Sequence, residues 1–234
     1  MISNKIAKNL LDNSFIFKIL FPYRYKELMA FTLAEVLITL LTIGIVASLV
    51  IPALITDTND AEYKTALKKT AADLNQAFTQ IRMQDSNGSV KGLFTSNSDI
   101  RDGFTKYLSI TKQCDDSETI GNCWTVFQRY MNNTPITAGT SSGAILNNGV
   151  SLRFRYSSGN CTNVSMTSAG YPICGWIYAD INGYRKGPNI WGKDLFGFWI
   201  MENRLMPMGF QGDSYVENDC SIYGVGCAAV YLAQ

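Results

Sequence analysis

The segment Phe31-Thr-Leu-Ala-Glu-Val-Leu-Ile-Thr-Leu-Leu-Thr-Ile-Gly-Ile-Val-Ala-Ser-Leu-Val-Ile-Pro-Ala-Leu-Ile55 is apolar throughout and contains one charged residue, Glu35. As an α-helix with a rise of about 1.5 Å per residue, it would be roughly 37 Å long. This length exceeds the roughly 30 Å hydrocarbon core of a bilayer. The segment can therefore span a membrane.

Three residues distinguish this segment from an ordinary membrane anchor. A carboxylate inside a bilayer is costly, although less so near a helix end, so Glu35 is expected to have a partner. Gly44 is a poor helix former, and Pro52 removes the backbone hydrogen bond that would reach back to Ser48. The segment is therefore predicted to be a helix that loosens near its middle.

The sequence Ala30-Phe-Thr-Leu-Ala-Glu-Val-Leu-Ile38, followed by the long apolar run, resembles the amino-terminal segment of the type IV pilin and type II secretion pseudopilin superfamily. The resemblance implies that a prepilin peptidase cuts between Ala30 and Phe31 and that the new terminus at Phe31 is N-methylated. It also implies that Glu35 pairs with the terminal amine of a neighbouring subunit during filament assembly. The family usually has Gly where this chain has Ala30.

The resemblance implies a structural subunit of a type IV pilus or a type II secretion-like filament, and not an enzyme. The partners it implies are other pilins in a homo- or hetero-oligomeric filament, the prepilin peptidase and an inner-membrane assembly platform. It implies a single-pass inner-membrane protein with an extracytoplasmic head, which enters a cell-surface or periplasmic filament. Two alternatives are a signal anchor that happens to contain this motif, and a membrane-tethered binding protein or adhesin.

Residues 1–30 are predicted to be a cytoplasmic leader. Positive charge before an apolar segment holds the amino end in the cytoplasm. A secretory signal peptide is cleaved after its apolar region, whereas the cut expected here precedes that region. Translation could instead begin at Met29, which would leave almost no leader. The charged residues of the leader are Lys5, Lys8, Lys18, Arg24 and Lys26 against Asp12 and Glu27.

Composition narrows the function further. The balance of 20 basic and 19 acidic residues gives no reason to expect nucleic acid as a partner. The chain has no histidine, which removes the common Ser-His and Cys-His catalytic pairs and most zinc hydrolase sites. We therefore expect no enzymatic activity.

The six cysteines all follow the apolar segment. An even number confined to the exported part indicates disulfides in an oxidising compartment, and the alternative is six reduced thiols. Six cysteines allow fifteen pairings. Pairing of sequential neighbours is favoured because each pair closes a short loop: Cys114 with Cys123, Cys161 with Cys174, and Cys220 with Cys227.

Residues 56–84 continue the helical pattern in an amphipathic form. Their apolar residues recur at the three-and-four spacing of a helix with one buried face. Residues 31–55 and 56–84 would then form one helix of roughly 80 Å, ended by residues 85–88 with Gly88 in a left-handed cap. Residues 85–234 would form the head. The apolar positions are Tyr63, Leu67, Leu74, Phe78 and Ile81.

The fold is predicted to be α+β, with an antiparallel sheet in the head. Residues 100–110 and 117–131 have helical spacing and are expected to form two short helices joined by a disulfide. Residues 137–148 are rich in Gly and Ser and are expected to form a loop. Strands are predicted at residues 150–156, 173–181, 195–202 and 204–208, and the first alternates so that Arg153 and Arg155 lie on its polar side. The resemblance implies that the sheet packs on the second half of the long helix.

Residues 180–194 are interpreted as a structured turn between two strands, in which Asn182-Gly183 suits a tight turn. An alternative is a calcium site like those in a loop near the sheet of some pseudopilins, for which Asp180, Asn182 and Asp194 could supply oxygen ligands. No other cofactor is expected. Residues 187–194 match the spacing of a phosphate-binding loop, but Asp194 replaces the Ser or Thr that binds magnesium, and a strand follows.

Three tryptophans of the head have two interpretations. Trp176, Trp191 and Trp199 could line a sugar- or surface-binding face, because an aromatic ring offers both an apolar plane and a polar edge. Packing in the core is the plainer interpretation.

Overall fold

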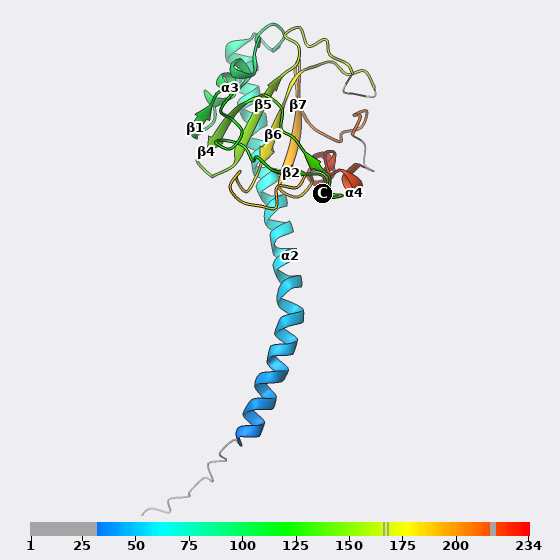
Figure 1. The fold of residues 1–234 in the computed structure, drawn as a ribbon. Coiled ribbons are helices and arrows are strands. Elements are labelled where there is room, and N and C mark those ends of the chain that lie inside the picture. The colour runs from blue at the N-terminus through cyan, green and yellow to red at the C-terminus, as the bar shows by residue number, and fades with distance from the viewer. Residues whose placement is uncertain (1–31, 166, 168, 216–218) are drawn as a thin grey trace, which may run out of the picture. The chain divides into compact units, whose positions relative to one another are not determined.

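The computed structural model describes residues 32–165, 167, 169–215 and 219–234, with the side chains of residues 52–59 left aside (Figure 1). The expected leader, together with Ala30 and Phe31, lies outside the described residues. The contacts divide the chain into two compact units, with the boundary between Ala53 and Leu54. Helix α2, Leu33–Gln80, contains residues of both units, and each unit is described separately.

In the first unit, the span Leu33–Ile51 of α2 is long and apolar enough to cross a membrane. Its mean hydropathy is 2.4, and none of it is buried within the chain. The bounds of α2 include both Gly44 and Pro52, and the loosening expected at these two residues stays a prediction. Apart from the backbone of α2 itself, no atom of the described residues lies within 4 Å of where a Cβ at position 44 would stand, so none of them requires glycine there.

The second unit is built around a six-stranded antiparallel sheet with the order β1-β4-β5-β6-β7-β8. The strands predicted at residues 150–156, 173–181, 195–202 and 204–208 are confirmed as β5 to β8. A separate two-stranded sheet pairs β2, Gln128–Arg129, with β3, Pro135–Ile136. The strands of the main sheet are β1 Ile110–Cys114, β4 Ser142–Leu146, β5 Ser151–Tyr156, β6 Ile173–Asp180, β7 Leu195–Met201 and β8 Leu205–Pro207.

One face of the sheet packs against helical segments of the second unit (Figure 1). The ring of Phe104, in helix α3 (Asn97–Thr105), lies between those of Phe78 and Phe154, at centroid distances of 6.3 and 5.8 Å. After α2, a π-helical turn covers Ile81–Asp85. Gly88 then has the expected left-handed φ, 97°, and its N–H donates to the carbonyl of Arg82 at 2.7 Å. Other buried members of this core are Leu67, Leu74, Ile100, Leu152, Phe196 and Phe198.

The opposite face of the sheet is also covered, by residues from the segment after β1 and from the carboxyl-terminal part of the chain. Its core contains Trp176, Trp191 and Trp199, which are 7%, 5% and 1% exposed, so packing in the core accounts for most of their surface, although Trp191 also lines a pocket. The prediction that the arginine side of β5 faces solvent is wrong, since Arg153 is only 2% exposed. Trp124, which lies far from β5 in the sequence, belongs to this cover.

Two predictions for the segment before β5 are wrong. Residues 117–131 form turns and β2 instead of a helix, because the Trp124 N–H bonds the Thr119 carbonyl and the Trp124 carbonyl accepts from the Gly121 N–H, which closes the segment into a turn. The loop expected at residues 137–148 contains strand β4. At Gly143 in β4, an added Cβ would lie 2.8 Å from side-chain atoms of both Cys123 and Thr119, so this strand needs a glycine where the turn crosses it.

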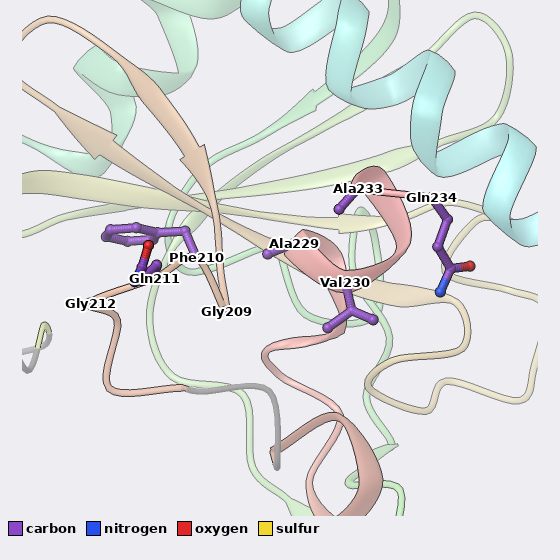
Figure 2. A pocket seen from close by; sticks show the side chains of 8 residues that line it. All are labelled: Gly209, Phe210, Gln211, Gly212, Ala229, Val230, Ala233 and Gln234. Atoms are coloured by element: carbon purple, nitrogen blue, oxygen red, sulfur yellow. The ribbon is translucent and has the colours of Figure 1, made fainter.

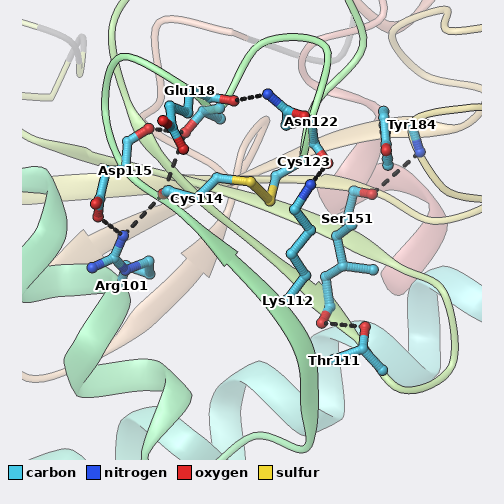
Figure 3. Close-up of a disulfide and its surroundings, with 12 residues drawn as sticks. Arg101, Thr111, Lys112, Cys114, Asp115, Glu118, Asn122, Cys123, Ser151 and Tyr184 are labelled. Atoms are coloured by element: carbon cyan, nitrogen blue, oxygen red, sulfur yellow. Dashed lines mark hydrogen bonds and ion pairs between the residues drawn. A yellow bond between two sulfur atoms is a disulfide. The ribbon is translucent and has the colours of Figure 1, made fainter.

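Three disulfides join the cysteine pairs expected from the sequence, Cys114–Cys123, Cys161–Cys174 and Cys220–Cys227. Figure 3 shows the first of them, which ties the end of β1 to the turn that follows. Arg101 of α3 braces this turn by donating to the Cys114 carbonyl at 2.9 Å and to Asp115 Oδ1 at 2.6 Å. The chain ends in two short helices, α4 Asp219–Ile222 and α5 Cys227–Leu232.

Candidate functional site

Glu35 lies in the first turn of α2 and caps the amino end of its own helix. The backbone N–H and the hydroxyl of Thr32 both donate to Glu35 Oε2 at 2.9 Å, and the Glu35 N–H donates to Thr32 Oγ1 at 3.2 Å. These reciprocal bonds form a capping box, which satisfies amides that the helix leaves open. The Thr-x-x-Glu spacing in the sequence is typical of such a capping box. The sequence-based prediction for Glu35 considered only a partner in another molecule.

The capping box leaves part of the Glu35 carboxylate available. Both bonds from Thr32 are accepted by Oε2, and Oε1 has no hydrogen-bond partner among the described residues. A carboxylate has about four acceptor positions, and the positive end of the helix dipole favours a negative charge there. The cap therefore orients the carboxylate without neutralising its charge, so a cation could still bind it.

The apolar side chains around and beyond Glu35 have no cover within the described chain. Leu33 is 80% exposed and Leu49 is 73% exposed, and the large apolar residues between them are exposed on every side of the helix. An apolar surface of this size marks contact with lipid or with other proteins. This unit is therefore an exposed apolar helix with one oriented carboxylate in its first turn.

The second candidate site is the turn between β6 and β7, where the structure brings Asp180, Asn182 and Asp194 together. Asn182 Nδ2 donates to Asp194 Oδ2 at 3.3 Å, and the Gly183 N–H donates to Asp180 Oδ1 at 3.0 Å. Gly183 has a φ of 93°, as a tight turn at Asn-Gly requires. The structured turn is thus confirmed.

The same turn argues against a phosphate site. The backbone N–H groups of Asn189 and Ile190, which a phosphate would need, both donate to the Asp194 carboxylate at 2.7 Å. Strand β7 begins at Leu195, so no helix follows whose amino end could hold a phosphate. The Asp194 carboxylate thus takes the hydrogen bonds that a phosphate would need.

Burial makes the two carboxylates of this turn unusual. Asp180 and Asp194 are fully buried, and neither belongs to an ion pair within the described residues. Burial, together with the neighbouring charge of Asp194, raises the pKa of Asp180 well above its usual value. Burial also raises the pKa of Asp194, although its backbone hydrogen bonds oppose the shift. The pair needs either a proton or a cation to remain buried.

The turn contains buried oxygens of the kind that bind calcium. Asp180 Oδ2, Asn182 Oδ1 and Asn189 Oδ1 are buried and have no hydrogen-bond partner within the described chain. Calcium prefers carboxylate and amide oxygens of this kind. The described residues contain no group of three or more His, Cys, Asp or Glu side chains suited to a metal, so amide oxygens would have to complete the set. A bound calcium ion would let both carboxylates ionise.

Asn189 is a candidate ligand that the sequence-based set of Asp180, Asn182 and Asp194 does not include. Its backbone has a φ of 55°, a left-handed conformation that Asn adopts more readily than most residues. The available signal is therefore its place after Pro188 in a turn, which is weaker than an acidic side chain as evidence for a metal ligand.

A wide pocket of about 790 Å³ lies between the segment after β8 and helix α5 (Figure 2). Among the residues that line it, none has a titratable side chain, and the polar side chains are the amides of Gln211 and Gln234. These described residues offer no side chain for acid–base catalysis. Its lining residues are Gly209, Phe210, Gln211, Gly212, Ala229, Val230, Ala233 and Gln234.

The two candidate sites differ in chemistry. Glu35 presents one carboxylate at the end of an apolar helix, whereas the turn between β6 and β7 encloses two carboxylates and two side-chain amides. The first suits contact with a cationic group of another molecule, and the second suits a structural cation. Comparison of the chain with protein-family models, with curated proteins and with solved structures found no match.

Proposed function

We propose that this chain is a structural subunit, a pilin, minor pilin or pseudopilin, of a type IV pilus or a type II secretion-like filament, without a catalytic role. The observation that carries the proposal is Glu35, an oriented carboxylate in the first turn of an otherwise uncharged and exposed apolar span. A simple membrane tether would use this side chain only as a helix cap, which an uncharged glutamine could also provide. A filament subunit can use the charge to fix the register of its neighbours.

In this proposal, a prepilin peptidase cuts between Ala30 and Phe31 and methylates the new terminus. The terminal amine of one copy then meets the free oxygen of Glu35 in its neighbour. Such a pair in an apolar surrounding has a high desolvation cost, so it contributes mainly to specificity and register. Burial of the exposed apolar side chains among copies supplies most of the stabilisation.

Residues 31–55 and 56–84 would act as one helix, with the apolar part in the filament core and the amphipathic part beneath the head. The absence of any neighbour at Gly44 supports this arrangement, because small residues let helices from different copies approach closely. Pro52 would allow the helix to loosen when it leaves the bilayer.

The proposed location is the inner membrane, with the amino terminus in the cytoplasm and the head on the other side. The membrane-compatible span and the surplus of positive charge in residues 1–30 support this orientation. The three disulfides of the head support an oxidising compartment. After assembly, the subunit would belong to a cell-surface or periplasmic filament.

Cysteine cross-linking in the membrane tests the proposal. All six native cysteines are in disulfides, so a single Leu40→Cys variant places one free thiol on the exposed helix. Oxidation is expected to produce a disulfide-linked dimer, the largest product that one free thiol per chain allows, and Glu35→Ala in the same background is expected to remove the dimer without preventing membrane insertion. Lys91→Cys, on the exposed surface of the head, controls for random collision. A tethered binding protein or adhesin would give no dimer from either position, which would overturn the proposal.

A further inference from the structure

Two neighbouring arginines of β5 lie on the face of the sheet opposite α2 and have only neutral partners. Arg153 donates from Nε to Ser141 Oγ at 2.6 Å and from Nη2 to the Gly139 carbonyl at 2.9 Å. The guanidinium of Arg155 lies 5.1 Å from the ring centroid of Trp176 and has no hydrogen-bond partner within the described residues. Neither arginine belongs to an ion pair of the described chain.

Among the described residues, no carboxylate lies within ion-pair distance of this arginine pair. Burial lowers the pKa of Arg153 to about 10, with a smaller contribution from the neighbouring charge of Arg155, so Arg153 remains cationic at neutral pH. Two described carboxylates on this side are already engaged, since Asp213 accepts from Trp199 Nε1 at 2.8 Å and Asp219 accepts from the Gly226 N–H at 2.9 Å. Arg153 is buried and Arg155 is half-buried, and a buried cation without a counter-ion reduces stability, which points to an anion that binds there.

The arginine pair lines a pocket of about 160 Å³ with aromatic walls, here named the β5 arginine pocket. The rings of Tyr178 and Trp191 meet edge to face, with centroids 4.9 Å apart. The side chain of Gln128 is 3% exposed and its Oε1 has no partner, and Trp191 Nε1 is likewise buried without a partner. The pocket is lined by Gln128, Tyr130, Ile136, Thr137, Gly139, Arg153, Arg155, Tyr178, Trp191, Tyr215 and Val225.

We propose that the β5 arginine pocket binds a sugar ring that carries a carboxylate, that is, a uronic acid unit of an acidic polysaccharide. The guanidinium groups of Arg153 and Arg155 would take the carboxylate through charge-assisted hydrogen bonds. The aromatic walls would take the apolar face of the ring, and a sugar hydroxyl would donate to Gln128 Oε1. The volume is close to that of a cavity of about 150 Å³ that holds benzene, so the pocket would take the carboxylate and one face of the larger sugar ring, and the rest of the unit would lie outside it.

Smaller anions use only part of this pocket. Acetate or phosphate would meet the two arginines but would leave the aromatic walls uncovered. A neutral sugar would meet the walls and Gln128 but would leave both positive charges unpaired. The combination of charge, ring and hydroxyl groups is what separates a uronate from these ligands.

Titration of the full chain in detergent micelles, followed by tryptophan fluorescence, tests this assignment. Galacturonate is the probe, and galactose, acetate and phosphate are the comparison ligands. Galacturonate is expected to bind at least about tenfold more tightly than any of the three, and its affinity should fall as salt is added. Absence of saturable galacturonate binding, or equal binding of galactose, acetate or phosphate, would overturn the proposal.

Arg155→Gln is the decisive variant, because this side chain makes no hydrogen bond that the fold would lose. It is expected to weaken galacturonate binding about tenfold or more, with the melting temperature unchanged. The galacturonate affinity of Arg155→Lys should lie between those of the unsubstituted chain and Arg155→Gln. Arg204→Gln is the matched control, since Arg204 lies over the ring of Tyr171, outside the pocket, at 5.3 Å. Unchanged galacturonate affinity in Arg155→Gln would contradict the assignment.

Discussion

Glu35 has two functions in this account, because its carboxylate both caps α2 and offers a free oxygen to another molecule. The two functions separate chemically. Glutamine can replace glutamate in a capping box but carries no charge. Alanine at position 32 removes the capping hydroxyl and leaves the charge of Glu35 in place.

We expect Glu35→Gln to insert into the membrane but to lose the cross-linked dimer of the Leu40→Cys background, as Glu35→Ala does. Thr32→Ala, the matched control, should lose the side-chain cap and still give the dimer, because the carboxylate remains charged. The measurement is the ratio of oxidised dimer to monomer on a non-reducing denaturing gel. If Glu35→Gln assembles as well as the unsubstituted chain, Glu35 is only a cap and the proposed pairing is wrong.

At the residue scale, the sequence identifies charged groups better than it identifies their partners. Glu35 stands out because a carboxylate in an apolar run is costly. Its contact with Thr32 is also predictable, since a capping box is a local pattern. The burial of Arg153 is not predictable in this way, because alternation along β5 shows which side chains share a face but not what covers that face.

At the scale of elements, the turn between β6 and β7 has a pH dependence with a definite sign. An unfolded Asp has a pKa of about 3.9, and the folded pKa values of Asp180 and Asp194 are raised above this. Stabilisation from the protonated pair is therefore fully present below the unfolded pKa and is lost as the pH rises through the folded pKa values.

Without divalent cations, the urea midpoint of the full chain in micelles is expected to fall as the pH rises from about 4 to 7. Millimolar calcium should restore it at pH 7, because bound calcium stabilises the folded state. Asp213 and Asp219 also have pKa values raised by burial and would contribute to the same pH dependence. Asp180→Asn is therefore the reference, because it changes only the turn between β6 and β7. This variant should show a weaker pH dependence and no response to calcium. An unsubstituted chain whose midpoint does not respond to calcium would discard the metal.

A second prediction at this scale concerns the crossing of β4 with the disulfide-bonded turn. Gly143→Ala would place a Cβ 2.8 Å from side-chain atoms of Cys123 and Thr119, so it should destabilise the head by about 1–3 kcal/mol. Gly187→Ala is the control, since nothing lies within 4 Å of its added Cβ. Urea unfolding at fixed pH measures both variants. Equal midpoints for the two would show that the turn does not press on β4.

Elements with strictly local patterns could be predicted from the sequence, and those shaped by distant contacts could not. Strands β5 to β8 follow from the alternation and turn residues of their own segments. The apolar residues of 117–131 imitate helical spacing, but Trp124 is buried in the core on the second face of the sheet. Strand β4 begins with Ser and Gly, which are typical of loops. Only the contact with the neighbouring turn explains why a strand forms there.

At the scale of the whole molecule, the candidate sites differ in how much the sequence reveals. The calcium candidates Asp180, Asn182 and Asp194 lie within one turn, so the sequence alone could group them. The lining of the β5 arginine pocket comes from β2, β3, β5, β6 and later segments, which only the folded sheet brings together. Sites assembled from distant segments have no local signature.

The two units are also suited to different surroundings. The first unit exposes apolar side chains that water would not tolerate, whereas the second has its own core on both faces of the sheet and three disulfides. This contrast is expected of a subunit whose helix is sheltered by lipid or by other copies while its head remains in water.

The central claim is that the chain loses its leader and assembles through its apolar helix. The most direct measurement is the amino-terminal sequence and intact mass of the protein recovered from sheared filaments and from the membranes of cells that make it. We predict that it begins at Phe31, with the mass of a methylated terminus, in both fractions. A protein that retains residues 1–30 and occurs only in the membrane fraction would contradict the account.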